Sequence, residues 1–389
     1  MKTLNQMLGA NRRLIARVIA LIPMIALALA SAQAGTVTTV ASTIPSNGDL
    51  NPYGVARVPT TTGSLTKGNI LVSNFNNSKN LQGTGTTIVQ ISPSGAVTLF
   101  AHIDASTLPG PCPGGVGLST ALVALRTGWV IVGSVPTTDG MSDTVQAGCL
   151  LVLNSSGQVV ETFFGSLING PWDMAAFDGG RNVSLFVTNV LNGTVAGGGK
   201  IVHEGTVLRL DLNIPHGAIP NLQQMTIVGS GFAERTDRNA LVIGPTGLAL
   251  NHRDRHDNDR YDTDRHDNDS HGGGVLYVAD TLNNRIIAIE DPLQRNTSDG
   301  TGMTVFQGGA LNAPLGLEIA TNGNILTVNG GDGYLVETKV EGHHGRQVRK
   351  VLLDEMGAMG AGALFGLIDV AGQGIYFVDD NENALNLFH

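Results

Sequence analysis

Two carboxylates stand where a repeated pattern otherwise has small or apolar residues. Asp173 occupies a position that is glycine in the other copies of the pattern, and Glu318 occupies one that is otherwise Ala, Ser or Ile. A charge at such a crowded position is costly unless it is paired, bound to a cation or used in a reaction. We therefore take both as candidate ligand- or metal-binding residues. A solvated or Arg-paired carboxylate is the structural alternative for each.

Polar side chains also follow the second strand of most copies. Carboxylate and amide oxygens suit a hard cation such as Ca²⁺, and a few aromatic residues beside them suit a ligand pocket. Alternatively, Asn and Asp hold β-turns by accepting backbone hydrogen bonds, and the aromatic residues pack between repeats. The polar set is Asn74, Asn189, Asp280, Asn329 and Asp379, with Gly133 as the exception in the second copy, and the aromatic set is Tyr53, Trp172 and Phe365.

The pattern that carries these residues is a repeated pair of short strands. Gly244-Pro-Thr-Gly-Leu-Ala precedes Gly274-Val-Leu-Tyr-Val-Ala-Asp280, and Ala313-Pro-Leu-Gly-Leu-Glu precedes Gly323-Asn-Ile-Leu-Thr-Val-Asn329. With 52 glycines and only 14% charged residues, the composition indicates many short strands joined by tight turns. The central positions of the six copies are Gly54, Gly117, Asp173, Gly247, Gly316 and Gly366.

A period of about 50–60 residues with about four strands per unit is typical of propeller blades. The sequence therefore predicts an all-β fold, a six-bladed β-propeller over 35–389. The sixth copy ends without a fourth strand, while Thr36-Val-Thr-Thr-Val-Ala41 alternates as a strand does. Because an open edge strand invites aggregation, we expect this N-terminal strand to pair into the last blade and close the ring.

The run Tyr277-Val-Ala-Asp-Thr-Leu-Asn-Asn-Arg-Ile286 resembles the NHL repeat, and the other copies resemble it more loosely. The resemblance covers nearly all of 35–389. It implies a propeller of the bacterial exported type, and it names no activity because NHL propellers include scaffolds and lyases. In architecture alone the chain is similar to the gluconolactonase-like six-bladed hydrolases, which hold a metal in their channel.

Strand order places the candidate residues at one end of the ring. In an antiparallel meander, the turn before the first strand and the turn after the second lie at the same end. We therefore expect the Asn/Asp set and the three aromatic residues to gather at one mouth of the central channel. The segment 251–271 should leave from the opposite face.

That segment is an Asp/His/Arg-rich insertion in which Asp-Arg-His-Asp-Asn-Asp occurs twice. It has almost no apolar residues, so we predict that it is disordered, with weak metal binding as the alternative. Cys112 and Cys149 are the only cysteines. For an exported protein we expect them to form a disulfide, and two separate buried thiols are the alternative.

Residues 1–34 have the features of an export signal. A basic start precedes the apolar run 18–30 and the small residues of Ala32-Gln33-Ala34. Thirteen apolar residues are fewer than the about 20 that a membrane span needs, so a retained anchor is the lesser alternative. Cleavage removes four positive charges and changes the net charge to −9 − 4 = −13. We expect a periplasmic or extracellular location, no stable membrane span and no nucleic-acid partner.

The sequence contains no complete catalytic constellation, since G-x-S-x-G and H-E-x-x-H are both missing. The first hypothesis is therefore an exported propeller that binds a small ligand or protein partner at a channel mouth without catalysis. The alternative is a metal-dependent hydrolase or lactonase that uses Asp173 and Glu318, with Ca²⁺ as the candidate cofactor. A structural module of the cell surface is a third hypothesis.

Overall fold

The computed structural model describes residues 35–252, 273–355 and 364–389. The predicted export signal, 1–34, and positions 253–271 of the predicted insertion lie outside these residues. In the described part of the chain, no helix has the length and apolar character that crossing a membrane requires.

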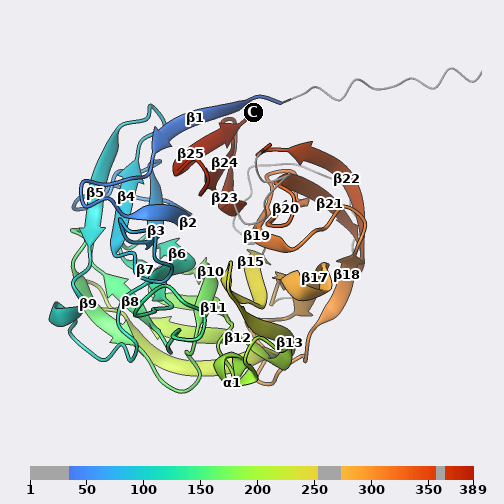
Figure 1. Ribbon diagram of the computed structural model, residues 1–389, viewed down its shortest axis with the longest axis horizontal. Helices are drawn as coiled ribbons and strands as arrows, with labels where there is room; N and C mark the ends of the chain where they lie inside the picture. Colours follow the sequence, from blue (N-terminus) through green and yellow to red (C-terminus); the bar gives the residue numbers. More distant parts are fainter. Residues whose placement is uncertain (1–34, 253–272, 356–363) are drawn as a thin grey trace, which may run out of the picture. The chain divides into compact units, whose positions relative to one another are not determined.

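Six antiparallel β-sheets form a ring, and Figure 1 shows them around a common centre. The predicted six-bladed propeller is therefore confirmed. The third sheet has five strands and the others have four. In blade order the strands are β2 (Leu50–Arg57), β3 (Ile70–Asn76), β4 (Thr87–Ile91) and β5 (Val97–His102); β6 (Leu118–Ala124), β7 (Val130–Ser134), β8 (Cys149–Leu153) and β9 (Val159–Phe163); β10 (Pro171–Asp178), β11 (Asn182–Asn189), β12 (Val202–Asn213), β13 (Asn221–Asp237) and β14 (Leu241–Ile243); β15 (Pro245–Asn251), β16 (Val275–Asp280), β17 (Arg285–Glu290) and β18 (Met303–Gln307); β19 (Pro314–Ile319), β20 (Ile325–Asn329), β21 (Tyr334–Glu341) and β22 (His344–Leu352); and β23 (Leu364–Val370), β24 (Gly374–Asp379), β25 (Ala384–Phe388) and β1 (Val37–Ser42).

Strand β1 closes the ring by pairing with β25, as the sequence predicts. Val37 lies opposite Phe388 and Ser42 opposite Ala384. The ladder continues to the C-terminus, where the Thr36 amide donates to the His389 carbonyl at 2.8 Å. The observed strand begins and ends one residue later than the predicted segment 36–41.

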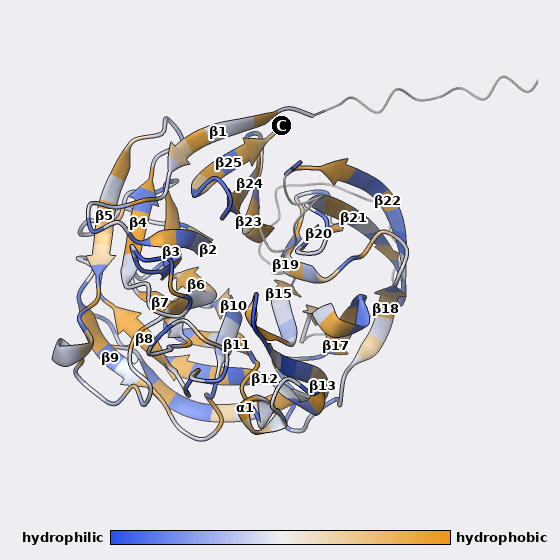
Figure 2. Ribbon diagram, viewed as in Figure 1, coloured by the Kyte–Doolittle hydropathy of each residue, from blue (hydrophilic) through white to orange (hydrophobic). Residues whose placement is uncertain are grey.

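Apolar side chains fill the space between neighbouring blades. Phe186, Val207, Val278 and Ile287 are all fully buried in one cluster that joins the third blade to the fourth. Figure 2 shows hydrophobic segments along the strands of every blade. Removing this area from water is the main stabilising contribution to the ring.

Close packing between neighbouring blades explains why the central position of the repeat is glycine. A Cβ atom on Gly247 would lie 2.3 Å from the carbonyl oxygen of Leu315, and one on Gly316 would lie 2.1 Å from that of Phe365. The inner strands of adjacent blades therefore approach too closely for a side chain directed at the next blade. Asp173 holds the corresponding place in β10.

The second blade departs from the predicted alignment of the copies. Leu118 pairs with Ser134 and Leu122 with Val132, so its inner strand holds one more residue in its bulge than the other blades hold. The prediction that Gly117 is the central residue of this blade is therefore wrong, and Thr120 occupies the equivalent position. Ser134, not Gly133, ends the second strand. The position equivalent to Glu318 is Val123.

Cys112 and Cys149 form the predicted disulfide within the second blade. The bond joins residues 37 apart, and Cys149 is fully buried in β8. We expect Cys112→Ala with Cys149→Ala to lower the free energy of unfolding by about 3–4 kcal/mol, because the bond restricts the unfolded chain. Urea unfolding measures the change, and the reduced parent protein should match the double variant. An unchanged midpoint would contradict this expectation.

Candidate functional site

Aromatic residues close the channel mouth at which the inner strands begin. The Tyr53 ring stacks on Phe365 at 3.8 Å and on Phe75 at 4.4 Å, and Trp172 meets both Tyr53 and Phe75 edge-on. Leu241, from β14, belongs to the same buried cluster. This mouth, where the sequence places the candidate site, is therefore filled by apolar packing between blades.

Three of the Asn/Asp residues bond to nearby loops of this end of the ring. Asn74 donates from Nδ2 to the Thr43 carbonyl at 3.1 Å. Asn329 donates to the Ala310 carbonyl at 2.8 Å, and Asp379 Oδ1 accepts from the Asn381 amide at 3.0 Å. These bonds hold the connections between strands, which is the turn-holding alternative weighed from the sequence.

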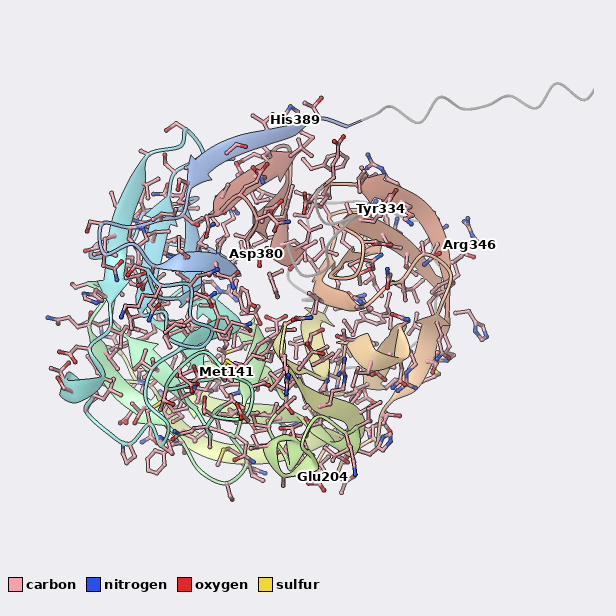
Figure 3. The ribbon with its side chains drawn as sticks, in the orientation of Figure 1. Met141, Glu204, Tyr334, Arg346, Asp380 and His389 are labelled. Carbon is pink, nitrogen blue, oxygen red and sulfur yellow. A yellow bond between two sulfur atoms is a disulfide. The ribbon has the colours of Figure 1, made fainter. Side chains whose placement is uncertain are left out.

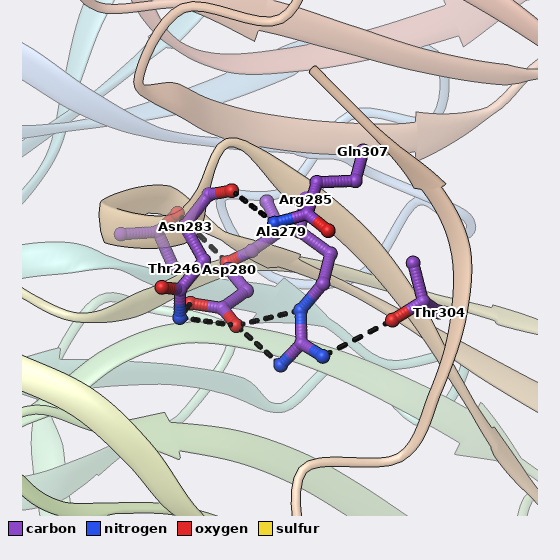
Figure 4. A network of polar contacts seen from close by, with 7 residues as sticks. All are labelled: Thr246, Ala279, Asp280, Asn283, Arg285, Thr304 and Gln307. Atoms are coloured by element: carbon purple, nitrogen blue, oxygen red, sulfur yellow. Dashed lines mark hydrogen bonds and ion pairs between the residues drawn. The ribbon is translucent and has the colours of Figure 1, made fainter.

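Asp280 is fully buried and paired with a cation. Its Oδ2 accepts from Arg285 Nη2 at 2.6 Å and from Arg285 Nε at 3.0 Å, and Asn283 donates to both of its oxygens (Figure 4). Arg285 also reaches Thr304. These charge-assisted bonds satisfy the carboxylate within its own blade. Asn189 is likewise fully buried, and neither atom of its amide has a protein partner.

The opposite half of the channel contains a cavity of about 440 Å³. This volume lies in the range of small-molecule pockets, about 300–1,000 Å³. The later halves of the inner strands line it, and Glu318 brings a carboxylate to its wall. Arg57, Arg126 and Asp178 lie among the other lining residues. One equivalent position of every blade contributes to the wall: Ala56, Val123, Ala175, Ala249, Glu318 and Ile368.

Asp173 lies at a narrow waist beyond this cavity. The waist has a free volume of about 10 Å³, about the room that a single water molecule needs. Asp173 Oδ1 accepts from the Met174 amide at 2.9 Å, and Oδ2 accepts from the Leu248 amide of the next blade at 3.0 Å. Its side chain therefore joins two blades and also borders the waist, which Thr120 and Thr246 line with it.

Both carboxyl groups have raised pKa values, and the charge of Asp173 contributes to that of Glu318. Burial, with smaller contributions from the charges of Asp173 and Asp369, raises the pKa of Glu318 to about 8, against the Ile319 backbone amide that lowers it. Burial also raises the pKa of Asp173 to about 7, against the two backbone hydrogen bonds that lower it. Near neutral pH, Glu318 is therefore mainly a proton donor, and Asp173 exchanges a proton readily.

The donor set alone does not make a metal centre. The described residues include no group of three or more His, Cys, Asp or Glu side chains placed to hold a metal ion. Asp173 and Glu318 supply two carboxylates, and none of Asn74, Asn189, Asp280, Asn329 or Asp379 lines the cavity. The two carboxyl groups of the channel can donate and accept protons.

The sequence contains two arginines that indicate this cavity. Arg57 ends the inner strand of the first blade and Arg126 follows that of the second, at the same end as Glu318. Arg126 donates its backbone amide to Asp178 Oδ2 at 2.6 Å and lies 3.8 Å from it as an ion pair. Charged residues at the C-terminal ends of the inner strands, rather than before these strands, therefore indicate which end of the channel is open.

No family model matches the sequence, and no curated protein matches it. Solved structures of similar fold do exist. A proposed glucose dehydrogenase from Thermus thermophilus is 12% identical with a TM-score of 0.52, over 91% of this chain and 100% of its own. A proposed gluconolactonase is 14% identical with a TM-score of 0.50, over 91% and 92%. The calcium-binding protein regucalcin from Agrobacterium tumefaciens is 11% identical with a TM-score of 0.50, over 89% and 92%. At these identities the likeness is one of fold.

Proposed function

We propose that the protein hydrolyses a small ester or lactone in the channel cavity, with Glu318 and Asp173 as the acid–base pair. One observation carries the proposal: carboxyl groups from two blades border the cavity and the waist of one channel, and the charge of Asp173 raises the pKa of Glu318. Carboxyl pairs of this kind divide the roles of proton donor and acceptor. The similar fold of a proposed gluconolactonase supports lactones as the substrate class.

The reaction follows from the places of the two groups. Asp173, in its ionised form, accepts a proton from a water molecule at the waist, and the water oxygen attacks the carbonyl carbon. The ester C–O bond breaks, and protonated Glu318 gives its proton to the leaving oxygen. Transfer of the proton from Asp173 to Glu318, through solvent, then restores both groups for the next turnover. The products are a carboxylic acid and an alcohol, which are one molecule when the substrate is a lactone. The apolar wall and the arginines Arg57 and Arg126 would hold the rest of the substrate.

Non-catalytic ligand binding is the second candidate function. Among the described residues that line the cavity there is no Ser, Cys or His, so no such side chain is available there as a nucleophile. For either function, we propose Ca²⁺ as the cation whose effect on binding or activity should be measured. We also propose, from the sequence alone, an exported member of the NHL-repeat type with a cleaved segment 1–34.

A panel of small lactones and aryl esters tests the proposed function. We expect Glu318→Gln and Asp173→Asn each to lower kcat/KM by about 100-fold, the contribution typical of a positioned acid or base. Glu341→Gln is the matched control, because Glu341 belongs to the same blade as Glu318 and is exposed. Full activity in Glu318→Gln would rule out its proposed role. Product binding by a parent protein that turns over no substrate would favour the non-catalytic function.

A further inference from the structure

A second pair of carboxylates lies in the third blade, and the proposed reaction does not use it. Glu234 is fully buried in β13, and neither of its carboxylate oxygens has a hydrogen-bond partner in the protein. Burial and the charge of Glu204 together raise its pKa to about 9, against the Asn192 backbone amide, which lies close enough to lower the pKa without the geometry of a hydrogen bond. A buried carboxyl group without partners is costly in either protonation state, because the neutral acid also needs an acceptor for its proton.

Glycines make room for both carboxylates of this pair. A Cβ atom on Gly205 would lie 3.1 Å from Glu234 Oε2, and one on Gly193 would lie 2.8 Å from Glu204 Oε2. Gly205 belongs to β12, which pairs with β13, and Gly193 precedes the short helix α1 (Thr194–Gly197). A side chain at either position would occupy the space that a carboxylate oxygen needs.

Glu204 is the exposed member of the pair. It lies beside α1, as Figure 3 shows. Solvent can therefore reach the pair from the Glu204 side, while Glu234 forms its buried end. An entry path on one side and unsatisfied oxygens on the other suit an ion that exchanges with solution.

We propose that Glu234 and Glu204 bind a divalent hard cation, Ca²⁺, at a site in the third blade that is separate from the channel. No third His, Cys, Asp or Glu joins them among the described residues, so backbone carbonyls and water would supply the remaining oxygen ligands, which Ca²⁺ accepts in flexible geometry. Its two charges balance those of the two carboxylates, which removes both their mutual repulsion and the cost of the unpartnered oxygens. The ion would tie β12 and β13 to the loop before α1.

Thermal unfolding of the full exported chain with CaCl₂, at pH 7.5 after treatment with EDTA, tests this proposal. We expect Ca²⁺ to raise the Tm of the parent protein in a saturable manner, because a ligand that binds only the folded state stabilises it. Glu234→Gln should abolish the Ca²⁺-dependent shift. Glu204→Gln should weaken the apparent affinity at least 10-fold, and this exposed substitution keeps the test valid if Glu234→Gln does not fold.

Glu318→Gln is the control that separates the two sites, and it should keep the Ca²⁺-dependent shift. MgCl₂ at the same concentration should give a smaller shift, because Mg²⁺ requires a stricter octahedral geometry. The proposal is overturned if Ca²⁺ does not raise the Tm of the parent, or if the shift survives in both Glu234→Gln and Glu204→Gln. A shift that disappears only in Glu318→Gln would overturn it too, because the cation would then belong to the channel.

Discussion

A chain that begins at Thr43 should fail to form a stable ring, whereas a chain that begins at Gly35 should behave as the parent. The first chain lacks β1, whose ladder with β25 runs from Val37 and Phe388 to Ser42 and Ala384. Its loss removes a set of backbone hydrogen bonds and exposes the edge of the last blade. We expect a loss on the order of 5 kcal/mol in the free energy of unfolding, together with aggregation through the open edge.

Size-exclusion chromatography and thermal unfolding of the two chains measure this effect. The chain from Gly35 is the control, because it retains the whole of β1. If the chain from Thr43 stays monomeric and unfolds at the parent's Tm, then β1 does not hold the ring closed.

Substituting the channel carboxyls should change how stability depends on pH. The pKa of Glu318 is raised from 4.5 to about 8, and that of Asp173 from 3.8 to about 7. Between the unfolded and folded values, the folded protein binds more protons than the unfolded chain does. The free energy of unfolding therefore falls as pH rises from about 4 to about 8.

Glu318→Gln and Asp173→Asn should each reduce the decrease in the free energy of unfolding between pH 4 and pH 8, because the new amide groups do not ionise. Each variant should match the parent near pH 4 and exceed it by on the order of 2 kcal/mol at pH 8. Asp173→Asn should gain less, because the Asp173 carboxylate accepts two backbone hydrogen bonds that Asn cannot both replace. Urea unfolding from pH 4 to 8 in EDTA measures these differences, with Glu341→Gln as the control. Parallel curves for parent and variants would contradict the raised pKa values.

The sequence predicts the ring well because its evidence is local and repeated. The turn and strand of Gly244-Pro-Thr-Gly-Leu-Ala recur in six copies, and Thr36–Ala41 alternates as a strand at the one place where a strand was missing. The disulfide was predictable because Cys112 and Cys149 are the only cysteines. Asp173 and Glu318 were found as departures from a repeat, which requires no knowledge of their surroundings.

The sequence could not predict which mouth is open, because that depends on contacts between blades. Tyr53, Trp172 and Phe365 are spaced as a ligand-binding set would be, yet their rings meet each other. The alignment of the second blade failed because one additional bulge residue shifts Thr120 into the place assigned to Gly117. Glu234 gave no signal, since its burial follows from the packing of β12 against β13.

The pH dependence of kcat/KM for a hydrolysed lactone tests whether Asp173 and Glu318 perform the reaction. We predict a bell-shaped profile whose two apparent pKa values, near 7 and 8, belong to the Asp173–Glu318 pair. Glu318→Gln should retain the rise at lower pH and lose the decline at higher pH, at a much reduced rate. A profile in Glu318→Gln with the same shape and height as that of the parent would contradict the claim that this pair performs the reaction.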